Sequence, residues 1–85
     1  MIETEHGNFE LIKEHRESFD VKSFNERYVD YLDRYQYIVG DISAEILRLK
    51  GFNEENKHLI DDYIMESTAL NASYYILKRI VEDKN

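Results

Sequence analysis

The sequence contains no cysteine and no proline, and only 3 of its 85 residues are glycine. Without cysteine the chain has no disulfide framework, no thiolate nucleophile and no zinc site built on sulfur, so a reducing cytoplasm fits best. Without proline or a Ser/Gly-rich tract, nothing marks a linker between domains. We therefore predict one cytoplasmic domain over residues 1–85, with residues 1–7 and 82–85 frayed.

Long apolar runs are also missing, since the longest uninterrupted one spans only a few residues. A membrane-spanning helix needs about 20 apolar residues in succession. The acidic N-terminus lacks the basic and apolar regions of a signal peptide. The sequence therefore predicts neither export by a signal peptide nor a membrane partner.

Positive charge is scarce, because 11 Lys and Arg residues face 18 Asp and Glu residues, for a net charge of −7. Such a chain repels phosphate backbones unless its few cations gather on one face, so nucleic-acid binding is disfavoured. The hydrophobic fraction of 42% and the charged fraction of 34% are ordinary for a folded domain and argue against disorder.

Apolar spacing predicts the elements of the first half. Residues 9–13 form a short mixed run that predicts a half-buried strand. Ser23-Phe-Asn-Glu26 has the spacing of a capping box, which predicts that a helix begins there. One apolar stripe with helical spacing follows, and we expect it to face a sheet: Phe24, Tyr28, Tyr31, Leu32 and Tyr35.

Residues 37–52 predict a β-hairpin. Residues 37–39 favour a strand, and we expect Gly40 and Asp41 to form a turn or a bulge. An Asp in a turn usually accepts hydrogen bonds from nearby backbone amides, which is the role expected for Asp41. The second strand then covers residues 46–52, where leucines alternate with Arg48 and Lys50.

Residues 59–81 allow two interpretations. Helical spacing resumes at residue 59, and the tail from residue 74 is rich in aromatic and β-branched residues, so a strand can follow a break near Asn71. The same spacing also fits one long helix. With the first interpretation, the fold is a single α+β domain in the order β-α-β-β-α-β, with two helices on one face of a mainly antiparallel sheet. The order of the strands in space stays open.

Four phrases occur in the same order as in the YutD-like family of small Firmicute proteins: Tyr37-Ile-Val-Gly-Asp41, Leu47-Arg-Leu-Lys-Gly-Phe52, Asp62-Tyr-Ile64 and Tyr74-Tyr-Ile-Leu-Lys78. The chain resembles a divergent, shortened member, with the similarity covering about residues 9–80. The resemblance implies a compact cytoplasmic α+β domain without an assigned reaction. It also favours helix, break and strand in the tail, because family members carry a glycine near the position of Asn71. Since the chain departs from the family at residues 42–45, Thr68 and Ala72, no site residue is carried over.

The candidate partner-binding residues are cations and tyrosines of the predicted strands: Arg48, Lys50, Tyr74, Tyr75, Lys78 and Arg79. Arg48 and Lys50 project from one face, and Lys78 or Arg79 can join them if the last strand lies nearby. Tyrosine suits the margin of an interface, because its ring covers apolar area while its hydroxyl stays in water. The alternative is an ordinary solvent-exposed strand face.

No catalytic motif is present: the sequence has no phosphate-binding glycine loop, no Gly-x-Ser-x-Gly elbow and no His-Glu-x-x-His helix. We therefore expect a protein that is not an enzyme and has no cofactor and no metal. The predicted function is a protein-interaction or regulatory module with an unidentified protein partner, and free strand edges also permit a homodimer. The alternative is an RNA- or nucleotide-binding domain that uses the same cations with stacked tyrosines.

Overall fold

The computed structural model describes residues 2–43, 45–67 and 73–80. This part of the chain forms one small domain with the following elements: β1 (Ile2–Thr4), β2 (Gly7–His15), α1 (Val21–Arg27), η1 (Asp30–Arg34), β3 (Tyr37–Ser43), β4 (Ile46–Phe52), η2 (Lys57–Leu59), α2 (Ile60–Ser67) and β5 (Ser73–Arg79). The helices η1 and η2 are short 3-10 turns. The α+β class, the single domain and the antiparallel sheet are confirmed. No helix in the described ranges is long and apolar enough to cross a membrane.

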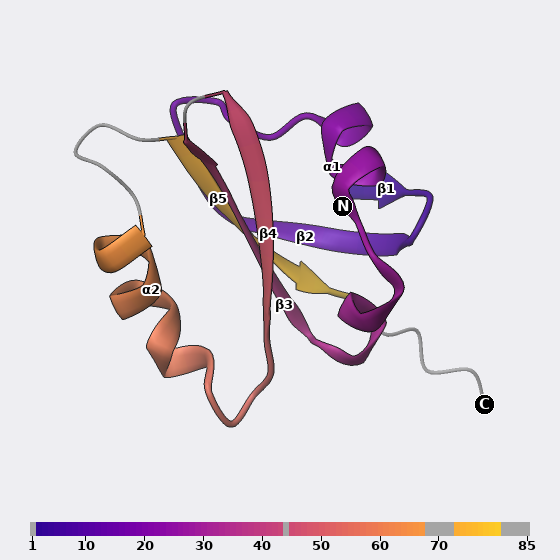
Figure 1. Cartoon of the computed structure of the whole chain (residues 1–85). Coiled ribbons are helices and arrows are strands. Elements are labelled where there is room, and N and C mark those ends of the chain that lie inside the picture. The colour runs from indigo at the N-terminus through magenta and orange to yellow at the C-terminus, as the bar shows by residue number, and fades with distance from the viewer. Residues whose placement is uncertain (1, 44, 68–72, 81–85) are drawn as a thin grey trace.

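The five strands make one sheet in the order β1-β2-β5-β3-β4, and each neighbouring pair is antiparallel. The last strand of the chain, β5, is inserted between β2 and β3 (Figure 1). Segments that are far apart in the sequence therefore lie side by side at the centre of the sheet. This arrangement answers the question of strand order that the sequence left open.

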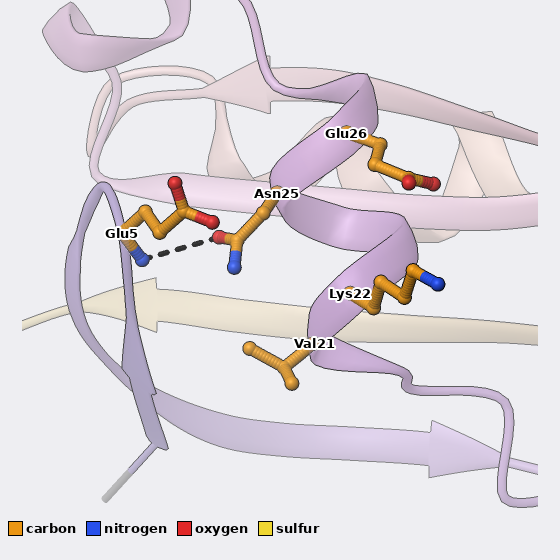
Figure 2. Close-up of a pocket in the computed structure, with 5 residues that line it drawn as sticks. All are labelled: Glu5, Val21, Lys22, Asn25 and Glu26. Atoms are coloured by element: carbon orange, nitrogen blue, oxygen red, sulfur yellow. Dashed lines mark hydrogen bonds between the residues drawn. The ribbon is translucent and has the colours of Figure 1, made fainter.

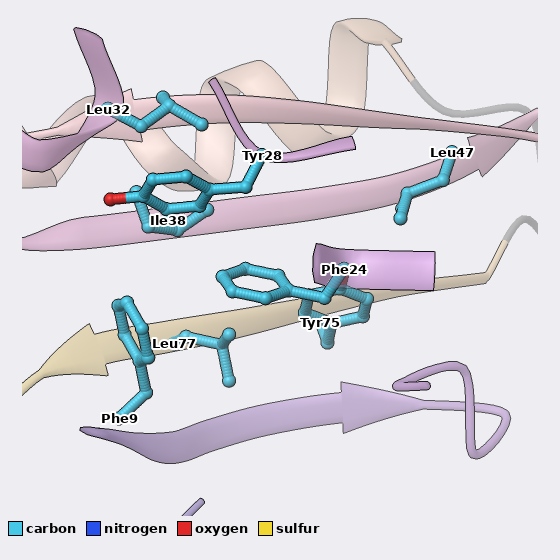
Figure 3. Close-up of a cluster of buried hydrophobic side chains, with 8 residues drawn as sticks. All are labelled: Phe9, Phe24, Tyr28, Leu32, Ile38, Leu47, Tyr75 and Leu77. Atoms are coloured by element: carbon cyan, nitrogen blue, oxygen red, sulfur yellow. The ribbon is translucent and has the colours of Figure 1, made fainter. Parts of the chain in front are cut away.

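The two helices cover opposite faces of the sheet (Figure 1). Ile38 of β3 belongs to the buried cluster around Phe24 of α1 (Figure 3), whereas the next residue, Val39, packs in a second cluster with Ile60 of α2. Successive strand residues point to opposite faces, so we call these the α1 face and the α2 face. The prediction of two helices on one face is wrong. An apolar stripe shows that a helix packs against the sheet, but it does not show which of the two faces of the sheet the helix covers.

The N-terminus forms a strand pair, so the predicted fraying of residues 1–7 is wrong for the described residues from Ile2 onward. Thr4 Oγ1 closes the turn between β1 and β2 by donating to the carbonyl of Gly7 at 2.8 Å and accepting from the amide of His6 at 3.0 Å. Gly7 has φ 119°, which a residue with a side chain rarely adopts. Three strand residues are too few to show an alternating pattern. Residues 82–85, also predicted to fray, lie outside the described residues.

The first helix begins earlier and ends sooner than predicted. Asp20 is the N-cap, since its carboxylate accepts from the Ser23 amide at 3.0 Å and from the Ser23 hydroxyl at 2.8 Å. These bonds lower the pKa of Asp20, and the capping box predicted at Ser23 does not form. The chain leaves the helix after Arg27 and forms η1. The predicted stripe is therefore divided, with Tyr31 51% exposed.

The hairpin and the helix followed by a strand are both confirmed. The register of β3 with β4 runs without interruption from Tyr37 opposite Phe52 to Ser43 opposite Ile46. Gly40 and Asp41 lie within β3, so the turn or bulge predicted there is wrong. The separate elements α2 and β5 exclude one long helix, while the predicted break near Asn71 lies outside the described residues.

Both glycines of the hairpin accommodate an aromatic ring on the α1 face. A Cβ at Gly40 would lie 2.3 Å from Cζ of Tyr75, and a Cβ at Gly51 would lie 2.2 Å from Cδ2 of Tyr35. Neither approach is possible with a side chain present. These glycines therefore allow aromatic rings to pack directly against the backbone of the strands, and they do not mark turns.

Candidate functional site

Asp41 is a completely buried carboxylate on the α2 face. One of its oxygens accepts from Nε and Nη2 of Arg48 at 2.9 and 2.7 Å, and the other accepts from the Tyr63 hydroxyl at 2.7 Å. The bonds join β3 to β4 and to α2, and they raise the pKa of the Arg48 guanidinium. The expected bonds from nearby backbone amides are replaced by side-chain bonds. Because both oxygens are engaged and buried, Asp41 has a structural role.

Tyr75 cannot contact a partner, because the folded chain buries it completely. Its hydroxyl has no hydrogen-bond partner within the described residues, and burial raises its pKa. Phe19 packs edge-on against its ring at 5.1 Å between centroids. The prediction of Tyr75 as a surface residue is therefore wrong.

Arg79 is half-buried on the α1 face. Its guanidinium lies 4.8 Å above the ring of Phe9. It donates to four oxygens, at 2.6 to 3.2 Å: the carbonyls of His6, Leu32 and Tyr35 and the hydroxyl of Tyr28. These acceptors belong to the turn between β1 and β2, the end of α1, and η1 and its C-cap. Arg79 thus ties the N-terminal half to β5, and these internal bonds engage the guanidinium that was predicted to bind a partner.

The remaining predicted residues share the α2 face but form two separate groups. Arg48 and Lys50 lie on β4, and Tyr74 and Lys78 lie on β5. Between them runs β3, whose α2-face residues are covered by Ile60, Tyr63 and Ile64 of α2. The sequence could not show this separation, because it depends on the strand order and on the position of α2.

The side of the α2 face over β2 and β5 carries a group of polar residues, which we call the β2–β5 surface: Glu10, Lys13, His15, Tyr74 and Lys78. His15 lies opposite Tyr74, and their rings stack at 5.3 Å with an interplanar angle of 14°. Lys13 Nζ lies 5.7 Å from the centre of the Tyr74 ring. Lys78 lies opposite Glu10 and is exposed. The surface therefore combines two lysines, one histidine and one carboxylate with a half-buried tyrosine.

The sequence did not indicate Lys13 and His15, because the predicted strand ended at residue 13 and because β2 contains a β-bulge. Leu11 pairs with Leu77, but Lys13 pairs with Ile76, so Ile12 is an extra residue in β2. Without this bulge, simple alternation would have placed Lys13 and His15 on the α1 face with Leu11. The polar residues at the end of β2 indicated an exposed surface, but the sequence could not show on which face of the sheet their side chains lie.

A shallow hollow of about 520 Å³ lies between the turn of β1 and β2 and helix α1 (Figure 2), lined by Glu5, Val21, Lys22, Asn25 and Glu26. The amide of Glu5 donates to Oδ1 of Asn25 at 3.2 Å across one wall. The carboxylates of Glu5 and Glu26 and the ammonium of Lys22 are exposed to solvent. No group of three or more His, Cys, Asp or Glu within the described ranges could hold a metal ion. The hollow offers no arrangement suited to catalysis.

The fold is a small antiparallel α+β domain in which the buried polar side chains mainly hold elements together. A family model described as "YutD-like: Putative antitoxin YutD-like" matches residues 3–78, and the chain belongs to this family. A curated relative named "Putative antitoxin YutD", from Bacillus subtilis (strain 168), is 36% identical over 89 residues, which cover 94% of this chain and 98% of the relative. The resemblance to the YutD-like family is thus confirmed.

A solved relative has the same fold. The solution NMR structure of protein yutD from B. subtilis superposes with a TM-score of 0.79 at 36% identity, covering 100% of this chain and 86% of the other. The similarity extends over every element described above. It supports the α+β class and the antiparallel sheet.

Proposed function

We propose that the protein is a cytoplasmic, non-enzymatic regulatory module that acts by binding another protein. The B. subtilis relative is named a "Putative antitoxin". That name supports a role in which this chain binds and restrains a toxin protein.

The β2–β5 surface carries the proposal. It presents Lys13, His15 and Lys78 around Tyr74 on a chain whose net charge is −7. The two lysines of this surface, on an acidic molecule, steer and orient an acidic partner surface while repelling basic ones. Tyr74 adds apolar contact area with a polar tip, and Ile12 nearby in β2 is 48% exposed. The partner surface therefore carries Asp or Glu side chains around an apolar centre.

The same surface also favours a second candidate, the binding of single-stranded RNA or a nucleotide, since cations and an aromatic ring lie on a part of the sheet that neither described helix covers. Two observations make this the weaker candidate. The ring of Tyr74 is already stacked with His15, and the whole chain repels phosphate. The salt dependence of binding distinguishes the two candidates. Phosphate binding weakens steeply between low and physiological salt, whereas a protein contact with an apolar centre weakens less.

The test is affinity capture of the tagged protein from host cells, with and without nuclease. We compare the wild type with Lys13→Glu/Lys78→Glu on the β2–β5 surface and with Lys22→Glu on α1, which lies on the other face and is also exposed. We expect one protein partner that resists nuclease, is lost in the double variant and is kept in Lys22→Glu. Loss of the captured material after nuclease would support the RNA candidate, and equal capture by all three proteins would contradict the proposed surface.

A further inference from the structure

β4 forms one edge of the sheet, and no strand lies beside it in the described part of the chain. All seven of its residues pair with β3 in one uninterrupted register. Proteins commonly protect such an edge with a bulge, a proline or charged side chains, and β4 has no bulge and no proline but carries Arg48 and Lys50. This β4 edge is therefore a regular template for a further strand.

The backbone groups at the β4 edge can be assigned from the register. Only two residues separate Ser43 from Ile46, so these two exchange hydrogen bonds, as does every second pair after them. The Arg79 amide donates to the Gln36 carbonyl at 2.6 Å, which confirms that even-numbered residues here turn toward β5 and odd-numbered ones toward β4. The amides and carbonyls of three β4 residues therefore point outward: Leu47, Leu49 and Gly51.

The side chains along the β4 edge differ between the two faces. On the α1 face, Leu47 is buried and Leu49 is half-buried against the core. On the α2 face, Lys50 is exposed, and the side chain of Arg48 keeps 49% of its surface exposed while it binds Asp41. An added strand would extend the apolar layer on one face and meet two cations on the other.

These cations disfavour pairing of β4 with a second copy of the chain. In a two-fold antiparallel pair centred on Leu49, Arg48 of one copy lies opposite Lys50 of the other. Pairs centred on Arg48 or on Lys50 place identical charges opposite each other. Like charges directly opposite are destabilising, and most so where the side chains are closest. In these three central registers a homodimer through this edge is therefore opposed by its own charges.

We propose that the β4 edge binds an extended segment of a partner protein in which acidic residues alternate with apolar ones. The acidic side chains would lie opposite Arg48 and Lys50, and the apolar ones beside Leu47 and Leu49. Backbone hydrogen bonds supply the affinity and the alternating side chains supply the selectivity. The inference goes beyond the proposed function, because the β4 edge and the β2–β5 surface lie on either side of α2 and either can fail alone.

The first test uses two short synthetic peptides, one alternating Val with Glu and one alternating Val with Lys. Amide NMR spectra of the labelled protein should show shifts at Leu47, Leu49 and Gly51 with the Glu peptide. The Lys peptide should bind roughly fivefold more weakly, because two like-charge pairs replace two opposite-charge pairs. Lys50→Gln should reduce this preference, and Lys22→Gln on α1 should not. Shifts elsewhere only, or equal binding of both peptides, would overturn the inference.

The second test uses the protein alone. Lys50→Glu places a carboxylate opposite Arg48 of a second copy, so the variant should dimerise more strongly than the wild type in sedimentation velocity. Adding Leu49→Pro should abolish the dimer, because proline removes an outward-pointing amide that the chain's own sheet does not use. A Lys50→Glu variant no more dimeric than the wild type would show that the edge does not accept a strand. Lys13→Glu/Lys78→Glu should change neither test, which separates this inference from the proposed function.

Discussion

The ring of Tyr75 lies over Gly40 at the centre of the sheet, and this contact determines what both positions tolerate. Tyr75 is completely buried, with its hydroxyl unpaired within the described residues. The ring fits only because β3 has no Cβ at residue 40. The dipeptide Gly40-Asp41 resembles a turn in the sequence, since both residue types are common in turns. Its true roles depend on Tyr75, Arg48 and Tyr63, which no local pattern connects to it.

Gly40→Ala should lower the free energy of unfolding by about 2 kcal/mol, because the added methyl group forces the Tyr75 ring to move. In a Tyr75→Leu background, which lacks the ring, the same change should cost much less. Urea unfolding of the four proteins of this double-mutant cycle measures the coupling. Additive effects would mean that the ring and the glycine do not interact.

Tyr75→Phe should leave stability unchanged or raise it by about 1 kcal/mol at neutral pH, since it removes a buried hydroxyl without a partner. Burial raises the pKa of Tyr75 above its unfolded value of 10.0. The titration of Tyr75 therefore leaves the free energy of unfolding unchanged below that pH. Above it the free energy of unfolding falls as the pH rises, because the unfolded chain releases the proton first. Unfolding free energies at neutral and strongly alkaline pH should show a smaller alkaline loss for Tyr75→Phe than for wild type. An identical loss would show that the hydroxyl is solvated.

At the scale of elements, Asp41 fixes how α2 lies on the sheet. Its carboxylate accepts from Tyr63 of α2 and from Arg48 of β4, so one buried group positions both. Among the described residues, α2 packs on the sheet through Ile60, Tyr63 and Ile64. The helix is therefore the element most sensitive to a change at this carboxylate.

Tyr63→Phe should lower stability by about 1 kcal/mol, because it deprives a buried carboxylate of one hydrogen bond. The loss should be local. Hydrogen exchange should become faster in α2, while amides of α1, on the other face, keep their protection. Equal acceleration in both helices would contradict an anchoring role for this bond.

An element could be predicted from the sequence where the residues that determine it are close together in the chain. The β3–β4 hairpin was recognisable because Leu47 and Leu49 alternate with Arg48 and Lys50 and the two strands are adjacent in the sequence. The bulge at Ile12 left no such signal, because it arises where β2 meets β5, about sixty residues further along the chain. The division of the first helical stripe was hidden as well, since Phe24, Tyr28 and Leu32 remain buried in either geometry.

At the scale of the whole molecule, the sequence could predict the candidate site only in part. Lys50 and Lys78 do lie on one face, but β3 and α2 separate them, and Arg79 lies within the opposite layer. Strand order and helix placement decide which cations meet, and both depend on long-range pairing. The grouping of Lys13, His15 and Lys78 around Tyr74 therefore appears only in the folded chain.

An acidic protein with one basic surface should bind in one orientation. The net charge of −7 repels an acidic partner everywhere except where cations gather. The β2–β5 surface is such a place. Strand pairing at the β4 edge would add a second contact on the other side of α2. Both place their cations on the α2 face, whereas α1 packs on the other face of the sheet.

In-cell photo-crosslinking tests this account most directly. A photoreactive amino acid replaces Lys78 on the β2–β5 surface in one protein and Lys22 on α1 in another, both at exposed positions. The account predicts a discrete, nuclease-resistant adduct with one protein from position 78, none from position 22, and loss of the adduct when Lys13→Glu is added. An adduct from position 22 alone, or a nuclease-sensitive adduct from position 78, would contradict it.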